Sequence, residues 1–275
     1  MVKAPQAAEQ GMTSTASVAE QRPWDMASSL ATVAGDVWPY IDTASEGPAL
    51  IMLPGSVGTC AMFFKQIRSL GERFRLISVS YPAQADPTRL ADGLAGLMDH
   101  LQLDRSSVLG SSFGGYWAQF FVLRHAARVE HLFLGNIFVT PNELFSNPLF
   151  DPAWIAKTSS EDLQAFWLGR VQQAPDSELK TIQIDMLSGR QSADNLKARF
   201  VGVARATLCP PLPLPAARIT IIDCDDDPII PPQSRHAVRD RYPGVHVRTL
   251  PKGGHYPHIL NPEAYDAIIT ERLSS

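Results

Sequence analysis

The sequence predicts an α/β fold in which a mostly parallel, doubly wound sheet carries helices on both faces. Three observations lead to this prediction. Short apolar runs alternate with longer segments whose apolar residues recur at helical spacing. Most of the runs are apolar at every position, which is typical of parallel strands that are buried on both faces. With 275 residues, 45% of them hydrophobic, the chain is long enough to bury one substantial core.

Six apolar runs are the predicted strands. In chain order they are ALIML (49–53), LISVSY (76–81), SVLG (107–110), HLFLGNIFV (131–139), RITIID (218–223) and VHVRTL (245–250). A stripe at helical spacing predicts a helix between the second and third runs. A second stripe follows Pro262, a residue favoured in the first turn of a helix. The first stripe is Leu90, Leu94, Leu97, Met98 and Leu101, and the second is Tyr265, Ile268, Ile269 and Leu273.

The alternation of strands and helices is interrupted between the fourth and fifth runs. This stretch has no clear strand and ends in the Pro-rich CPPLPLP (209–215), a composition typical of a linker. We therefore predict a helical cap at 140–213, inserted between core segments 23–139 and 214–275. The alternative is that the stretch only adds two helices to the main domain. Residues 1–22 lack the apolar segment of a signal peptide and are expected to form a mobile tail.

Composition and charge argue against several classes of function. The net charge is −4, only 19% of residues are charged, and no basic stripe is present, so no nucleic-acid partner is expected. No apolar run approaches the roughly 18 residues that cross a bilayer, so no transmembrane segment is expected. The cysteines Cys60, Cys209 and Cys224 are odd in number and lack C-x-x-C spacing. They predict free thiols, no metal site and a cytoplasmic protein.

The segment Gly110-Ser111-Ser112-Phe113-Gly114 fits the pattern G-x-S-x-G between an apolar strand and a helix. In that setting the pattern indicates a nucleophile elbow, a sharp turn that exposes the serine oxygen. Small residues two positions before and after the serine let the strand and helix approach closely. The alternative is a tight glycine turn without chemistry. We predict that Ser112 is the nucleophile.

A serine hydroxyl needs a base to take its proton and an acid to orient that base. The sequence offers GGHYPHILNPE (253–263) after the last strand run and DCDDDPIIPP (223–232) after the preceding one. We predict that His255, which follows two glycines at a strand end, is the base. His258, three residues later, is expected to be a supporting or surface histidine.

From residue 49 to its carboxyl end the chain resembles the α/β-hydrolase family, in which the triad occurs in the order Ser, Asp, His. The resemblance is carried by LPGSVGT, DHLQLDRSSVLGSSFGG, DDDPIIPP and KGGHYPH. In that family the acid lies four residues before a proline, which matches Asp227 and Pro231. The resemblance therefore implies Asp227 as the acid. Asp225 and Asp226 are its competitors and are expected to lie in a solvated acidic loop.

The family also builds an oxyanion hole from two backbone N–H groups. One would come from Phe113, the residue after the nucleophile. The other would come from Ser56 in LPGSVG (53–58), which follows the first core strand. This sequence has Pro54-Gly55 where the family has His-Gly, so the loop lacks a side-chain anchor. The alternative is a plain glycine turn.

Two further segments, LPGSVGTCAMFFKQIRSLGERFRLISVSYP and MDHLQLDRSSVLGSSFGGYWAQFF, resemble the maspardin-like branch of the family. Maspardin-like proteins are regarded as binding or trafficking proteins and do not keep the histidine, whereas this chain has His255. We therefore predict a serine hydrolase that cleaves a carboxylic ester or thioester of a small or acyl-chain substrate, without cofactor or metal. The alternatives are a non-catalytic binding scaffold and a carbon–carbon bond hydrolase or lyase. Any of these proteins could form a homo-oligomer.

Overall fold

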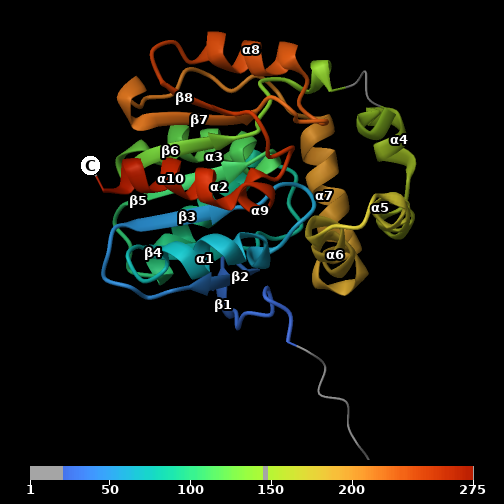
Figure 1. Cartoon of the computed structure of the whole chain (residues 1–275), viewed down its shortest axis with the longest axis horizontal. Coiled ribbons are helices and arrows are strands. Elements are labelled where there is room, and N and C mark those ends of the chain that lie inside the picture. The colour runs from blue at the N-terminus through green and yellow to red at the C-terminus, as the bar shows by residue number, and fades with distance from the viewer. Residues whose placement is uncertain (1–20, 145–147, 275) are drawn as a thin grey trace, which may run out of the picture.

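The computed structural model describes residues 21–144 and 148–274. Within them, one sheet of eight strands has the order β1-β2-β4-β3-β5-β6-β7-β8 (Figure 1). The strands from β3 to β8 pair in parallel, and all six predicted runs are among them. Their bounds are β3 Ala49–Leu53, β4 Arg75–Val79, β5 Ser106–Ser111, β6 Val129–Gly135, β7 Ile219–Cys224 and β8 His246–Leu250. The predicted α/β fold class is confirmed.

The sequence did not predict an antiparallel hairpin at the edge of the sheet. It consists of β1 (Ser29–Val33) and β2 (Asp36–Asp42), and β2 pairs antiparallel with β4. Ala34 and Gly35 form its two-residue turn, and both have positive φ, at 51° and 90°. Two-residue hairpins favour this conformation, but Asn-Gly or Asp-Gly is its usual sequence, so Ala-Gly gave no signal.

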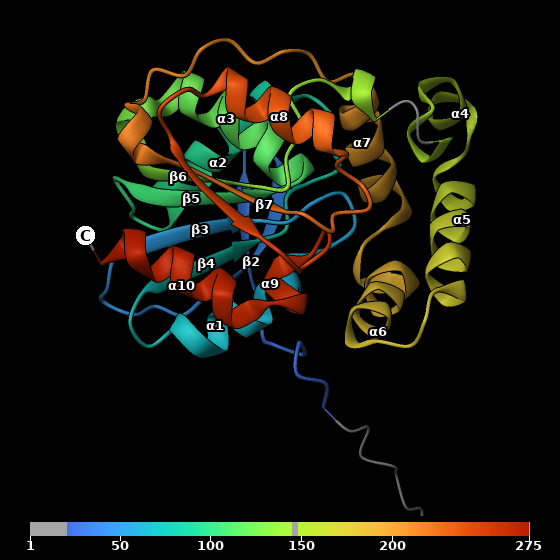
Figure 2. The same cartoon turned by 45° about the horizontal axis from the view of Figure 1, so that its top comes forward.

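Helices cover both faces of the sheet (Figures 1 and 2). On one face lie α2 (Pro87–His100), α3 (Phe113–His125) and α8 (Pro232–Arg241). On the other lie α1 (Phe64–Leu70), α9 (Pro257–Leu260) and α10 (Pro262–Leu273). In β3, Ile51 and Leu53 pack in the first core cluster, and Leu50 and Met52 in the second. Burial on both faces is why the central strands of the sheet are largely apolar.

Both predicted helical stripes lie in helices. In the first, Leu90, Leu94, Leu97 and Met98 are fully buried on α2, while Leu101 lies just beyond the last residue of that helix. All four apolar residues of the second stripe are buried on α10.

Between β6 and β7 the described residues form helices and turns but no strand. The four α-helices are α4 (Pro152–Lys157), α5 (Ser160–Gln173), α6 (Glu178–Asp185) and α7 (Ala193–Ala204). They lie together beside one end of the sheet, with α7 nearest to it (Figure 2). The boundaries of a separate cap at 140 and 213 remain a prediction.

Residues 1–20 of the predicted tail lie outside the described part of the chain. Arg22, which is described, forms an ion pair with Asp185 at the end of α6. Among the described residues no helix is both long and apolar enough to span a bilayer. The three cysteines are free and buried, and burial raises the pKa of Cys209 and of Cys224 to about 12.

Two histidines are buried in the core. His131 on β6 is bonded to Thr220 on β7, with 2.8 Å between Nε2 and Oγ1. Burial, together with nearby positive charges, lowers the pKa of His131 to about 4. His258 on α9 packs its ring 4.7 Å from the ring of Phe63. His258 is buried, so it is a core residue and not a surface one. This burial, with a smaller effect of His255, lowers the pKa of His258 to about 3.

These depressed pKa values predict a loss of stability in mild acid. Unfolded histidine titrates near 6.5, so below this pH the unfolded chain binds protons that the folded chain does not. Each buried histidine should therefore lower the unfolding free energy by about 2 kcal/mol when the pH falls from 7.5 to 5. A phenylalanine at position 258 suits the aromatic surroundings and does not titrate. Between pH 7.5 and pH 5 we therefore expect the unfolding free energy of His258→Phe to fall by about 2 kcal/mol less than that of the wild type. Urea denaturation at the two pH values measures the difference, and identical losses in the two proteins would contradict it.

Candidate active site

The chain makes a strained turn where β5 meets α3. Ser112 has φ of 51° and ψ of −121°, an unusual conformation for a residue with a side chain. A Cβ atom on Gly110 would lie 2.5 Å from the backbone of Gly115, and one on Gly114 would lie 2.4 Å from the carbonyl oxygen of Leu53. Both glycines of the motif are therefore required by close contact between strand and helix. The turn has the geometry that the motif predicts.

His255 and Asp227 lie together at the ends of neighbouring strands. Asp227 follows β7 and His255 follows β8, and the distance from Nδ1 of His255 to Oδ2 of Asp227 is 2.9 Å. The Asp227 side chain is fully buried. Its Oδ1 accepts hydrogen bonds from the backbone N–H groups of Ile229 and Ile230, at 2.7 and 3.0 Å. Of the three consecutive aspartates, Asp227 is the one in contact with His255.

Burial alone would raise the pKa of the Asp227 carboxyl group. The charge and hydrogen bond of His255 oppose this effect, together with the hydrogen bonds from Asn136 and the N–H of Ile230. On balance the pKa of Asp227 lies below its ordinary value, so the side chain is a carboxylate at neutral pH. A carboxylate bonded to Nδ1 fixes the ring so that Nε2 is the free nitrogen.

Two further residues support this pair, and sequence reasoning missed the first of them. Asn136, just after β6, donates from Nδ2 to Asp227 at 2.6 Å and to the carbonyl oxygen of Gly254 at 3.1 Å. Its φ is 46°, a left-handed conformation that asparagine tolerates better than most residues. Asp226 lies in an exposed loop, as expected, and accepts a hydrogen bond from the N–H of Gly254 at 2.8 Å.

Asp225 also matches the expectation of a solvated loop. Its side chain is 64% exposed and lies 3.7 Å from the guanidinium of Arg235. Asn136 fell inside the predicted strand run 131–139, and only the structure shows that the strand ends one residue before it, at Gly135. A lone asparagine at a strand end is too common to indicate a site.

Ser112 and His255 line one small cavity of about 100 Å³. No hydrogen bond joins the Oγ of Ser112 to the His255 ring in this arrangement, and such bonds often tighten only when a substrate is present. Ser56 lines the same cavity. The rest of the wall is mainly apolar and is formed by Val57, Phe138, Leu144, Phe150, Trp167, Phe200, Val203, Ile229, Ile230 and Tyr256.

The two predicted oxyanion donors flank the serine. Phe113 is the first residue of α3, whose N-terminal end carries a partial positive charge. Ser56 follows Gly55, on which a Cβ atom would lie 3.2 Å from the Cβ of Ser112. Among the described residues, neither the N–H of Phe113 nor that of Ser56 donates a hydrogen bond. Both therefore remain available to an incoming oxygen.

The loop from 53 to 58 has a side-chain anchor that the sequence did not indicate. The hydroxyl of Tyr81, which is buried after β4, donates to the carbonyl oxygens of Pro54 at 2.8 Å and Gly55 at 3.2 Å. The expectation that Pro54-Gly55 leaves the loop without a side-chain anchor is therefore wrong.

Comparison with known proteins agrees with this description. The model of the family described as "Alpha/beta hydrolase family" matches residues 50–268. The chain is 28% identical over 235 residues to maspardin of Danio rerio, which covers 81% of this chain and 74% of that protein. It is also 24% identical over 251 residues to the putative carbamate hydrolase RutD of Caulobacter sp. (strain K31), covering 84% and 92%. The predicted resemblance to maspardin-like proteins is confirmed.

Solved structures resemble the fold at low sequence identity. An esterase from Thermogutta terrifontis superposes with a TM-score of 0.77 at 21% identity, covering 90% of this chain and 98% of the esterase. The enol-lactonase from Burkholderia xenovorans LB400 gives a TM-score of 0.75 at 16% identity, covering 90% and 100%. These likenesses concern the fold, and the family model spans all of its core strands from β3 to β8. The chain belongs to the α/β hydrolase family.

Proposed function

We propose that the protein is a serine hydrolase that cleaves a carboxylic ester or thioester through an acyl-enzyme. The observation that carries the proposal is that His255, bonded to the buried Asp227, lines the same cavity as the strained Ser112. In this proposal Ser112 is the nucleophile, His255 the base and Asp227 the group that orients it. The hydrolase and esterase relatives support hydrolysis in general terms.

The proposed reaction has two halves. Nε2 of His255 takes the proton of Ser112 while Oγ attacks the substrate carbonyl carbon, and the N–H groups of Phe113 and Ser56 donate to the resulting oxyanion. The imidazolium then gives its proton to the leaving alcohol or thiol, and an acyl-enzyme remains. In the second half, His255 takes a proton from water while the water oxygen attacks the acyl carbon. The bond from that carbon to Oγ of Ser112 then breaks, the imidazolium returns its proton to Oγ, and the carboxylic acid is released.

The cavity limits the size of the acyl group. Its volume of about 100 Å³ is well below the roughly 300–1,000 Å³ of pockets that hold drug-sized ligands. Its walls are mainly aromatic and aliphatic, and none of the described residues in them carries a full charge besides the titratable His255; the other polar side chains are those of Ser56, Ser111, Ser112, Gln183 and Tyr256. A short apolar acyl group fits this environment, since it fills the space and requires no charged partner. We propose acetyl to butanoyl esters or thioesters as the preferred substrates.

We expect turnover of p-nitrophenyl esters to fall steeply from butanoyl to octanoyl chains. Trp167 is a wall residue whose ring lies 4.8 Å from that of Phe200. Trp167→Ala should enlarge the cavity and shift the preference toward longer chains by at least about 10-fold in the kcat/KM ratio, because each buried methylene contributes roughly 0.8 kcal/mol. Phe166→Ala is the matched control, because Phe166 is 41% exposed and does not line the cavity.

An unchanged chain-length profile in Trp167→Ala would contradict the placement of the acyl group. Activity of the wild type on no ester or thioester would favour the second candidate, a non-catalytic binding scaffold. That candidate is supported by the similarity to maspardin.

A further inference from the structure

The loop that carries Ser56 is held from its outer side by two residues of the α4–α7 segment. Nη1 of Arg199, on α7, donates to the carbonyl oxygens of Gly55 at 2.8 Å and of Gly58 at 2.7 Å. Gln191, just before α7, accepts a hydrogen bond from the N–H of Gly58 at 3.0 Å and donates to the carbonyl oxygen of Ser56 at 2.8 Å. We call Arg199 and Gln191 the loop clamp. Both were missed by sequence reasoning.

The environment of Arg199 is unusual for a charged side chain. It is 1% exposed, and no carboxylate of the described residues lies within ion-pair distance of it. Its guanidinium carbon stacks 3.8 Å from the centre of the Tyr81 ring. Burying an uncompensated positive charge is costly, and packing alone would be served better by an apolar side chain. The carbonyl oxygens of the loop are its polar partners.

The planar peptide group connects this clamp to the predicted oxyanion donor. In a trans peptide the C=O of one residue and the N–H of the next point in opposite directions. The carbonyl oxygen of Gly55 points toward Arg199, so the N–H of Ser56 points away from it. Gly55 lies against Ser112 and Ser56 lines the cavity, so that opposite side is where the substrate carbonyl would lie. A positive charge at the Gly55 oxygen also polarises the peptide group and makes the N–H a stronger donor.

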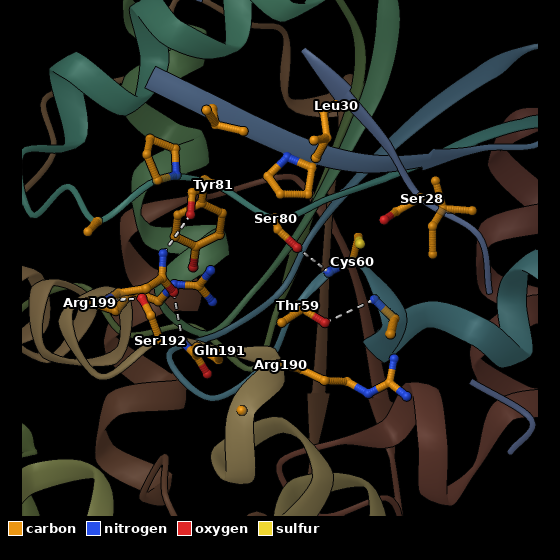
Figure 3. A pocket seen from close by; sticks show the side chains of 18 of the residues that line it. Ser28, Leu30, Thr59, Cys60, Ser80, Tyr81, Arg190, Gln191, Ser192 and Arg199 are labelled. Carbon is orange, nitrogen blue, oxygen red and sulfur yellow. Dashed lines mark hydrogen bonds between the residues drawn. The ribbon is translucent and has the colours of Figure 1, made fainter. Parts of the chain in front are cut away.

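Figure 3 shows the clamp from the neighbouring groove of about 650 Å³, with Arg199 beside Tyr81 and with Gln191 preceding Ser192. Several polar groups of the groove are bonded to protein, among them Asn195. Nδ2 of Asn195 donates to the carbonyl oxygen of Tyr81 at 2.7 Å, and its Oδ1 accepts a bond from Gln191 at 2.9 Å. Asn195 thus ties the clamp to the end of β4. This wall of the groove therefore supports the loop from 53 to 58 that carries Ser56.

We propose that Arg199 and Gln191 are positioning residues that fix the orientation of one oxyanion-hole donor, the N–H of Ser56. They hold the Ser56 peptide with its N–H directed at the reacting carbonyl oxygen and touch no substrate themselves. The next residue, Phe200, is in the cavity wall, so the same helix that closes the acyl pocket also sets the hole. This inference rests on the proposed function.

The test compares Arg199→Met, Arg199→Lys and Gln191→Leu in the full-length protein, with a short-chain p-nitrophenyl ester as substrate. We expect Arg199→Met to lower kcat by about 10²-fold with KM nearly unchanged, because a displaced donor acts only on the transition state. Gln191→Leu should lower kcat by about 10-fold. Arg199→Lys should regain most of the activity, because a single nitrogen makes both carbonyl bonds. Arg205→Met, at the exposed end of the same helix, is the matched control.

A second readout separates positioning from folding. A trifluoromethyl ketone forms a tetrahedral adduct with an oxyanion, so its inhibition constant should weaken in proportion to the loss in kcat, while that of a short carboxylate product should not change. Full kcat in folded Arg199→Met and Gln191→Leu would overturn the inference, as would a loss confined to KM or to the folded fraction. A wild type that is inert toward both the ester and a fluorophosphonate would instead overturn the proposed function.

Discussion

Ser112→Ala is expected to abolish fluorophosphonate labelling and to lower kcat/KM for a short-chain ester by at least about 10³-fold. The loss follows because Oγ is the only atom proposed to bond to the acyl carbon. The fold should survive, since the hydroxyl of Ser112 makes no capping hydrogen bond to α3. Alanine also removes no apolar contact from the core. Mass spectrometry of the labelled peptide and circular dichroism measure the two outcomes.

Ser111→Ala is the neighbouring control. Ser111 ends β5, pairs in the sheet with Gly135, and precedes the strained position. It should keep most of the activity and all of the labelling. Labelling that persists in Ser112→Ala but disappears in Ser111→Ala would move the nucleophile by one residue. A wild type that takes up no label would instead favour a binding scaffold.

The sheet could be predicted from the sequence because its central strands are buried on both faces. Most of the runs are largely apolar, and each is followed by a helix or a turn signal. The edge hairpin gives a weaker pattern. β1 has one buried residue among five, and Pro39 in the middle of β2 argues against a strand. An edge strand with one face toward solvent needs no continuous apolar run, so its sequence resembles that of a loop.

The site residues likewise fall into those that a local sequence pattern predicts and those that it does not. Ser112 and its glycines form a local motif, and Gly110 is required by a close contact with Gly115 only five positions away, whereas Gly114 is required by a contact with Leu53 on another strand. The choice of Asp227 depended on its spacing to Pro231. The structure gives a physical reason for that choice, since the turn lets one carboxylate oxygen accept two N–H groups while the other faces His255.

The residues that sequence reasoning missed act at long range. Gln191 and Arg199 bond to a loop more than 130 positions earlier in the chain, and Asn136 bonds to Asp227 across 91 positions. No local pattern in a single sequence marks such pairs. Their side chains are also ordinary ones for helix surfaces and strand ends. These contacts become visible only when the fold brings the ends of the strands and the α4–α7 segment together.

Asp227→Asn is expected to lower kcat by about 10⁴-fold while leaving the fold intact. An amide at this position can present its NH₂ group to Nδ1 of His255, which places the imidazole proton on Nε2. The ring then cannot accept the proton of Ser112. The amide also has one oxygen to accept the bonds that the two carboxylate oxygens now receive from Asn136, Ile229 and Ile230.

The neighbouring aspartates make this prediction specific. Asp225→Asn should change kcat by less than about 3-fold, because its side chain is exposed and its ion pair with Arg235 is long. Asp226→Asn should have an intermediate effect, because Asp226 supports the loop of His255 through the N–H of Gly254 without touching the ring. Steady-state kinetics on one short-chain ester orders the three variants. If Asp226→Asn lost as much activity as Asp227→Asn, the orientation of the loop would matter as much as the charge beside Nδ1. If Asp227→Asn kept its activity, another group would have to orient His255, and among the described residues no other carboxylate contacts that ring.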